Sequence, residues 1–260
     1  MADALDRWAG QLAAWAVPEH ILAVAPESPW QIPHRAFARR ADRRIGAPST
    51  PTHEAVLAAL PGTLVDVGAG AGAASLPCAS AITHVTALDT SARLLAEFAA
   101  RADALGLPHR VVEGRWPDTP TEPADVVVCA NVLYNAPGLA RFAHALTGHA
   151  RRRVVVELAA VHPMTSLNPL WRHFHDLDRP AGPTADDAIA ALRELGISPD
   201  VLRWHDQREP EYEHFDELVD ITRRRLCLPA ERSAEVADAL RGSPDFGSTA
   251  RDVVTLIWTC

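Results

Sequence analysis

Residues 64–72 read Leu64-Val65-Asp66-Val67-Gly68-Ala69-Gly70-Ala71-Gly72, a short apolar run that ends in a glycine-rich turn. An alanine-rich segment with a helix-like composition follows, so the order strand, loop, helix is predicted here. The three glycines allow positive φ angles and remove side-chain bulk, which lets a ligand approach the backbone closely. We therefore expect a flat or polar ligand to lie against this loop.

Strand-like and helix-like segments alternate from residue 63 onward. Strands are predicted at residues 64–67, 83–88, 110–113, 125–130, 153–158, 199–204 and 253–258. Helices are predicted at residues 71–80, 92–105, 139–148, 184–195, 214–227 and 230–241, with Pro77 shortening or kinking the first of them. Such alternation is typical of a doubly wound α/β domain. The sequence thus predicts a seven-stranded, Rossmann-like sheet.

The N-terminal third is predicted to be helical. Leu5, Trp8, Leu12 and Trp15 recur at near-helical spacing, which indicates an amphipathic helix over residues 3–17. Further helices are expected at residues 34–44 and 52–60. We therefore divide the chain into an N-terminal helical cap at 1–60 and an α/β domain at 61–260, with insertions near 161–182 and 210–247.

The composition argues against a nucleic-acid partner and against a membrane segment. The formal net charge is −8, and every basic side chain is arginine, which disfavours a surface for nucleic acid. The run Arg223-Arg224-Arg225 is interpreted as a solvated helix face. Four scattered cysteines indicate reduced thiols, and no apolar stretch approaches the ~20 residues that span a bilayer. We expect a cytoplasmic protein without a membrane segment, and the oligomeric state stays open.

Two cofactor classes fit the glycine loop. Gly68-x-Gly70-x-x-Ala73, with Asp89 further on, is an acceptable dinucleotide fingerprint and would suit an NAD(P)-dependent oxidoreductase. Asp66, however, stands where dinucleotide-binding strands usually carry an apolar residue. The chain also has no lysine and hence no Tyr-x-x-x-Lys pair.

With Asp66 included, the sequence resembles the class I S-adenosylmethionine-dependent methyltransferases, whose first motif reads acid-x-Gly-x-Gly-x-Gly. The resemblance covers residues 63 to about 205, and the terminal strand extends it to 258. It implies the family's α/β sheet, S-adenosyl-L-methionine as cofactor, and methyl transfer to an oxygen or nitrogen of a small organic or short peptide acceptor. A non-catalytic relative that only binds a partner stays open as an alternative.

The resemblance also implies cofactor-binding residues. Asp89 matches the acid that accepts hydrogen bonds from the ribose hydroxyls, and Asn131 lies at the position nearest the methionine half. The adenine would lie near residues 114–116, although this chain departs there from the family's usual acidic and apolar pair. The full expected set is Asp66, Gly68, Gly70, Gly72, Asp89, Thr90, Arg115, Trp116 and Asn131.

Methyl transfer is an in-line displacement, so the protein must chiefly align the nucleophile and exclude water. A hydroxyl or amine acceptor could need a base, and His162, shortly after a predicted strand, is the leading candidate. Tyr134 follows Asn131 at the spacing of the Asn-Pro-Pro-Tyr motif of amino-group methyltransferases, without its prolines. The expected acceptor-binding residues are Trp30, His34, Trp171, His173 and His175. The histidine spacing fits no metal-ligand pattern, so no metal is expected.

Overall fold

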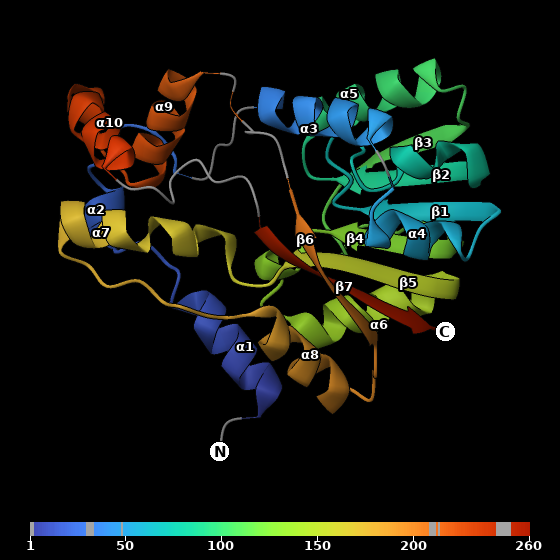
Figure 1. The fold of residues 1–260 in the computed structure, drawn as a ribbon. Helices are drawn as coiled ribbons and strands as arrows, with labels where there is room; N and C mark the ends of the chain where they lie inside the picture. The colour runs from blue at the N-terminus through green and yellow to red at the C-terminus, as the bar shows by residue number, and fades with distance from the viewer. Residues whose placement is uncertain (1–2, 30–33, 48, 208–211, 213, 243–250) are drawn as a thin grey trace.

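The computed structural model describes residues 3–29, 34–47, 49–207, 212, 214–242 and 251–260. The described part of the chain forms one seven-stranded sheet with the strand order β3-β2-β1-β4-β5-β7-β6 (Figure 1). The strands are β1 (Gly62–Val67), β2 (Ile82–Asp89), β3 (His109–Glu113), β4 (Ala124–Ala130), β5 (Ala150–Ala159), β6 (Asp200–Asp206) and β7 (Arg251–Thr259). The α/β fold predicted from the sequence is confirmed.

The order of the strands reverses beside β1. β1 pairs in parallel with β2 on one side and with β4 on the other, and only β7 runs antiparallel to its neighbours β5 and β6. In open α/β sheets, ligands bind beyond the carboxyl ends of the strands where the order reverses. The glycine loop directly follows β1 and therefore lies at this position.

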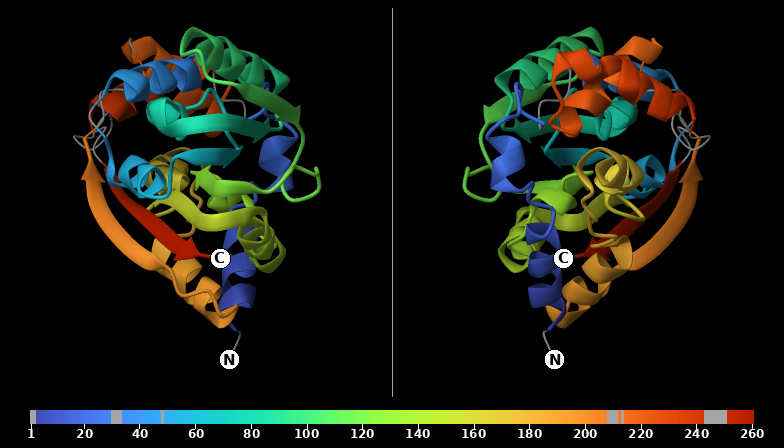
Figure 2. Two further views of the ribbon diagram at one scale, coloured as in Figure 1. Left: turned by 90° about the vertical axis from the view of Figure 1, so that its right-hand side faces the viewer. Right: turned by 90° about the vertical axis from the view of Figure 1, so that its left-hand side faces the viewer.

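Helices cover both faces of the sheet (Figure 2). Leu64 and Val65 point to opposite faces, as the two-residue period of a strand requires, and belong to two separate apolar cores. One core is formed with α1 (Ala4–Ala13), α6 (Leu139–His149) and α8 (Ala185–Glu194). The other is formed with α4 (Pro51–Leu57), η1 (Leu76–Ala81) and α5 (Ala92–Ala104).

A third apolar core lies in the helices inserted around the sheet. It joins α2 (Glu19–Leu22), α7 (Asn168–His175), α9 (Phe215–Arg225) and α10 (Ser233–Arg241), with the short η3 (Pro163–Leu167) and η4 (Ala230–Arg232) beside them. Arg223 corrects one expectation, because its side chain is buried instead of solvated. It donates to the Leu228 carbonyl and pairs with Glu27 and Asp220, so it ties α9 to two loops.

Two predicted helices differ from the observed ones. The helix predicted at 71–80 is replaced by turns up to residue 75 and the 3-10 helix η1. Gly72 has φ +98°, which no right-handed helix accommodates, and Pro77 lies in the first turn of η1, where proline is tolerated. The first helix ends at Ala13 instead of residue 17.

The N-terminal helices lie at three places. α1 packs on α6 and α8, α2 belongs to the inserted helices, and α3 (His34–Gly46) and α4 pack beside η1 and α5. The division at residue 60 stays a prediction. Within the described ranges, no helix is both long enough and apolar enough to cross a bilayer.

Candidate active site

The glycine loop turns back over the end of β2. The amides of Gly68 and Ala69 both donate to the Leu88 carbonyl, and three glycines adopt left-handed φ angles: Gly68 (+69°), Gly70 (+53°) and Gly72 (+98°). Such angles favour glycine because a Cβ would crowd the backbone. The conformation of the loop therefore requires glycine at these three positions.

The three glycines have different surroundings. A Cβ on Gly68 would lie 2.3 Å from Val132 Cγ2, and one on Gly72 would lie 2.3 Å from Leu76 Cδ1. On Gly70 a Cβ would meet only Phe37 Cδ1, at 3.9 Å, among the residues described. Close packing thus explains Gly68 and Gly72, whereas a Cβ on Gly70 would make only an ordinary van der Waals contact.

Asp89 is the half-buried carboxylate at the end of β2. Its Oδ2 accepts the Gly70 amide at 2.9 Å and its Oδ1 accepts the Ser91 amide at 2.9 Å. A carboxylate offers about four lone-pair positions, so both oxygens keep acceptor capacity. Thr90, the next residue, is exposed. The Asp89 carboxylate is therefore held against the backbone of the glycine loop at Gly70.

Asp66 is fully buried beneath the loop. Ser75 Oγ donates to its Oδ2 at 2.6 Å, while its Oδ1 has no hydrogen-bond partner. Burial raises the pKa of the Asp66 carboxyl from 3.8 to about 7, more than the Ser75 hydrogen bond lowers it. Asp66 thus offers an unused acceptor atom below the glycine loop.

The two residues expected beside the adenine point in different directions. Arg115 is exposed. Trp116 is buried in the core on the α6 side, where its indole N–H donates to the Phe142 carbonyl at 3.4 Å and its ring meets His149 edge-on at 4.7 Å. Packing against α6 therefore already occupies the Trp116 ring.

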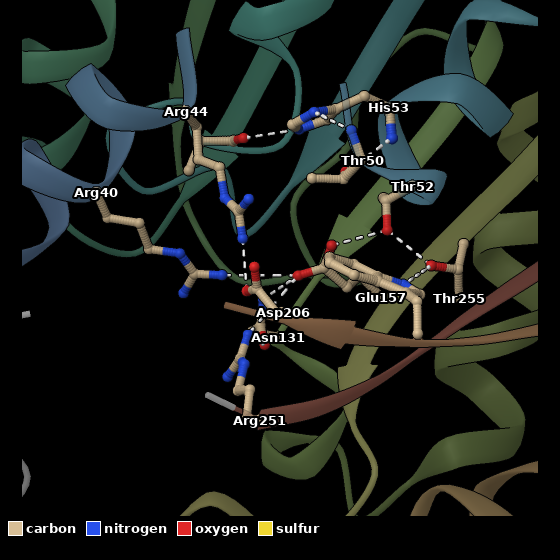
Figure 3. A network of polar contacts seen from close by, with 12 residues as sticks. Arg40, Arg44, Thr50, Thr52, His53, Asn131, Glu157, Asp206, Arg251 and Thr255 are labelled. Carbon is tan, nitrogen blue, oxygen red and sulfur yellow. Dashed lines mark hydrogen bonds and ion pairs between the residues drawn. The ribbon is translucent and has the colours of Figure 1, made fainter. Parts of the chain in front are cut away.

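Asn131 has both ends of its side chain engaged by the protein. It adopts φ +62°, donates through Nδ2 to Glu157 Oε1 at 3.0 Å, and accepts at Oδ1 from Arg251 Nη2 at 2.8 Å (Figure 3). Its own amide donates to the Glu157 carbonyl at 2.7 Å. Asn131 thus joins the ends of β4, β5 and β7.

Glu157 and Asp206 are the buried acids of a larger polar network (Figure 3). Thr52 Oγ1 of α4 donates to Glu157 Oε2 at 2.8 Å. From α3, Arg40 lies 3.6 Å from Glu157 Oε1 and Arg44 donates to Asp206 Oδ2 at 2.5 Å. Local sequence patterns do not predict this network, although the one sequence signal for it is Glu157, a glutamate within the otherwise apolar run of residues 154–158.

Tyr134 and His162 lie in a column of aromatic rings. Trp8 stacks on Tyr134 with centroids 5.7 Å apart, Tyr134 meets His162 edge-on at 5.1 Å, and His162 stacks on Trp15 at 4.1 Å. Arg179 follows, 5.4 Å from the Trp15 ring. The structure therefore brings together Tyr134 and His162, the two residues that the sequence suggests for catalysis. Trp8 of α1 packs against Tyr134.

Hydrogen bonds and burial determine the protonation of Tyr134 and His162. The Tyr134 hydroxyl donates to the Ala159 carbonyl at 2.8 Å, and burial raises the pKa of Tyr134 well above its ordinary range. The Met164 amide donates to His162 Nδ1 at 3.3 Å, so neutral His162 carries its proton on Nε2. Burial and the charge of Arg179 lower the pKa of His162 to about 4. His162 is thus neutral, with Nε2 as a hydrogen-bond donor and with the Nδ1 lone pair engaged by the Met164 amide.

The expected acceptor-binding residues are dispersed. Trp171 is buried in the core of the inserted helices, and His175 Nε2 lies 2.7 Å from the Leu226 carbonyl. His173 is exposed beside Phe174. Trp30 lies outside the described residues, as does the side chain of His34, the first residue of α3. Among these five, Trp171 is linked to the aromatic column, through Arg179, which lies 5.0 Å from its ring.

Comparison with known proteins adds to this geometry. Residues 64–153 match a family described as a methyltransferase domain. No curated protein matches the sequence. A methyltransferase structure from Bacillus halodurans, described as putative, is 14% identical, with a TM-score of 0.55 over 81% of this chain and 99% of that chain.

Two further structures contain S-adenosyl-L-homocysteine (SAH). An S-adenosylmethionine-dependent methyltransferase from Thiobacillus denitrificans is 18% identical, with a TM-score of 0.53 over 87% of this chain and 98% of that chain. Magnesium protoporphyrin IX methyltransferase from Synechocystis PCC 6803 is 16% identical, with a TM-score of 0.51 over 83% and 92%. With identities of 14–18%, the three structures show that this chain has the same fold as these proteins.

Proposed function

We propose that this chain, in which residues 64–153 match a methyltransferase domain, transfers the methyl group of S-adenosyl-L-methionine to an oxygen or nitrogen atom of a small organic acceptor. The observation that carries the proposal is the joint position of Gly70 and Asp89. A glycine in the left-handed conformation and a carboxylate with spare acceptor capacity are hydrogen-bonded to each other at the carboxyl edge of β1 and β2. This combination suits a ligand with a flat part and vicinal hydroxyls.

The described residues fit the cofactor. Asp89, with Thr90 beside it, would accept hydrogen bonds from the ribose, and the backbone at Gly68, Gly70 and Gly72 would lie against the ligand. Asp66 Oδ1, buried and without a partner, suits the ammonium of the methionine part. Arg115 remains proposed for the adenine edge. Trp116 and Asn131 would support the site from behind, because their side chains are already engaged.

The bound cofactor would supply an activated methyl group on its sulfonium. The protein would then align the acceptor and exclude water, which are the main requirements of an in-line displacement. His162 suits this task as a neutral donor at Nε2 that orients an acceptor oxygen or nitrogen. Tyr134, whose hydroxyl is bound to Ala159, would fix the wall against which His162 packs.

The acceptor site is proposed around the aromatic column at Trp8, Trp15, Tyr134 and His162. Trp30, His34, Trp171, His173 and His175 remain proposed contributors from the flanking segments. Aromatic walls with few polar groups favour a small molecule or a short peptide. The net charge of −8 argues against nucleic acid, and four free cysteines support a reducing, cytoplasmic environment.

Methyl-labelled S-adenosylmethionine tests the proposal directly. The protein is incubated with panels of hydroxylated, carboxylated and amine-containing small molecules and short peptides, and both SAH and labelled product are measured. We expect acceptor-dependent SAH formation with one small-molecule class. Thermal stabilisation by NAD or NADP, with none by SAH, would contradict the proposal and favour the oxidoreductase.

A further inference from the structure

Arg179 lies in the segment that runs from α7 to α8 past the end of α1 (Figure 1). Its Nη1 donates to the Ala16 carbonyl at 2.9 Å, and its Nη2 donates to the Trp15 carbonyl. The central carbon of its guanidinium lies 5.4 Å from the centre of the Trp15 ring and 5.0 Å from that of Trp171 in α7. Both tryptophans are buried. Arg179 therefore joins the end of α1 to the inserted helices.

The same segment holds Trp15 by a second hydrogen bond. The Trp15 indole N–H donates to the Gly182 carbonyl at 2.7 Å. Asn168 Nδ2 of α7 donates to the carbonyls of Arg179, at 3.3 Å, and Pro180, at 2.8 Å, and so ties the segment to α7. Both the ring and the backbone of Trp15 are thus held by the segment that carries Arg179.

Trp15 in turn sets the orientation of the His162 ring. The two rings stack with centroids 4.1 Å apart and an angle of 15° between their planes. The titratable group in contact with the imidazole is Tyr134, which meets it edge-on at 5.1 Å and donates its hydroxyl proton to Ala159. The Met164 amide occupies Nδ1, so within the described part of the chain Nε2 is the imidazole nitrogen without a hydrogen-bond partner. The direction of the Nε2–H bond therefore depends on Trp15.

The charge of Arg179 is not neutralised by an acid. In the described part of the chain its guanidinium contacts two carbonyl oxygens and two aromatic rings but no carboxylate. Arg172 at the end of α7, in contrast, pairs with Asp176 and Asp178. An uncompensated cation disfavours a second cation nearby, and Arg179 acts together with burial to lower the pKa of His162. Arg179 therefore favours a neutral imidazole at His162.

We propose that Arg179 is a positioning residue, which holds Trp15 against His162 so that the imidazole presents its Nε2–H to the acceptor as a neutral donor. The inference rests on the proposed function, in which His162 orients the acceptor. Arg179 itself contacts neither the glycine loop nor Asp89. Its removal should therefore impair methyl transfer and leave cofactor binding intact.

Two substitutions separate the hydrogen bonds of Arg179 from its charge. Arg179→Gln removes the charge, whereas Arg179→Lys keeps it but loses the planar fork that reaches both carbonyls. Arg172→Gln is the matched control, because this arginine is also close to Trp171 in the chain but is 58% exposed and paired with acids. Three quantities are measured in the full-length proteins: kcat/KM for the acceptor, SAH affinity by calorimetry, and the NMR titration of the His162 imidazole, assigned by comparison with His162→Gln.

The two Arg179 variants should differ in the titration of His162. We expect Arg179→Gln to lower kcat/KM about tenfold at unchanged SAH affinity, and to raise the midpoint of the His162 titration by about one pH unit. Arg179→Lys should lower kcat/KM a few fold, because one ammonium replaces the fork, and should move the midpoint by less than half as much. Arg172→Gln should match the unchanged protein in all three quantities.

The outcomes separate this inference from the proposed function. If the unchanged protein methylates no member of the acceptor panel, the proposed function fails, and the inference fails with it. If it methylates an acceptor while Arg179→Gln keeps full kcat/KM, keeps the His162 midpoint or loses SAH binding, the function stands and the inference is wrong. Should Arg179→Gln not fold, Arg179→Lys decides, and full kcat/KM in that variant would contradict the inference.

Discussion

The Gly70 amide donates a hydrogen bond to Asp89 Oδ2 over 2.9 Å, which joins the loop after β1 to the end of β2. The bond fixes the carboxylate beside the backbone of Gly70. The glycines differ in a way that can be tested, because a Cβ would overlap a neighbouring side chain at Gly68 and Gly72 but not at Gly70.

Alanine substitutions should therefore separate stability from binding. Gly70→Ala should destabilise the fold by about 1–2 kcal/mol, the cost of a left-handed alanine, and abolish SAH binding. Gly68→Ala should destabilise it more, because its Cβ would overlap Val132. Denaturant unfolding and SAH titration measure the two effects. Equal stability losses, or retained binding by Gly70→Ala, would contradict the account.

The role of His162 can be read from pH dependence. Its pKa of about 4 keeps the ring neutral from pH 5 to 9, with Nε2 as donor and with Arg179, Tyr134 and Trp15 beside it. His162→Gln retains a donor and should keep most activity, whereas His162→Ala should lose about tenfold or more in kcat/KM. An inflection of the rate near pH 6.5 that disappears in His162→Gln would instead identify a base.

Asp66 should make stability depend on pH in an unusual direction. Its pKa is raised to about 7, so the folded state holds a proton that the unfolded state loses above 3.8, and stability falls as pH rises between these values. Asp66→Asn removes this dependence. Relative to the unchanged protein, the variant should gain about 3 kcal/mol between pH 5 and pH 8.

Urea unfolding at both pH values measures that gain. Groups shared by the two proteins titrate alike, so their contributions cancel in the difference. A difference in unfolding free energy that does not change with pH would show that Asp66 is ionised in the folded state throughout.

The ion pair between Arg44 and Asp206 should contribute to stability because it is largely buried, with 16% and 4% of the two side chains exposed. Arg44→Met would leave Asp206 with a weakened set of partners and should cost about 3 kcal/mol. The matched control is Arg141→Met, whose pair with Asp118 is equally short but 70% and 53% exposed, and which should cost under about 1 kcal/mol. Similar losses in both variants would show that burial does not strengthen the first pair.

Much of the fold follows from local sequence signals. Apolar strand segments, capping residues such as Thr184 and the glycine turn each depend on neighbours close in the chain, and the seven strands and most helices are where these signals predict them. The exception is residues 71–75, which are predicted as helix and form turns. These turns are consistent with the positive φ of Gly72, whose missing Cβ leaves room for Leu76 and Phe98.

The details of the site depend on contacts between distant residues. The family resemblance predicts that Asn131 lies nearest the methionine half of the cofactor, but it does not predict that Glu157 and Arg251, which are 26 and 120 positions away in sequence, engage the Asn131 side chain. Trp116 has the expected position in the chain, yet packing against α6 determines the direction of its ring. Periodicity and motif spacing carry no information about such partners.

The central claim is that the glycine loop and Asp89 bind the cofactor, and calorimetric titration with SAH tests it most directly. The unchanged protein should bind SAH with one site per chain. Asp89→Ala should bind at least about a hundredfold more weakly, because it loses charge-assisted hydrogen bonds to the ribose. It should still unfold cooperatively, at a lower melting temperature, because the Gly70 and Ser91 amides lose their acceptor. Asp103→Ala, which removes a largely exposed carboxylate from α5, should bind normally. Absence of SAH binding by the unchanged protein, or equal affinity in Asp89→Ala, would contradict the claim.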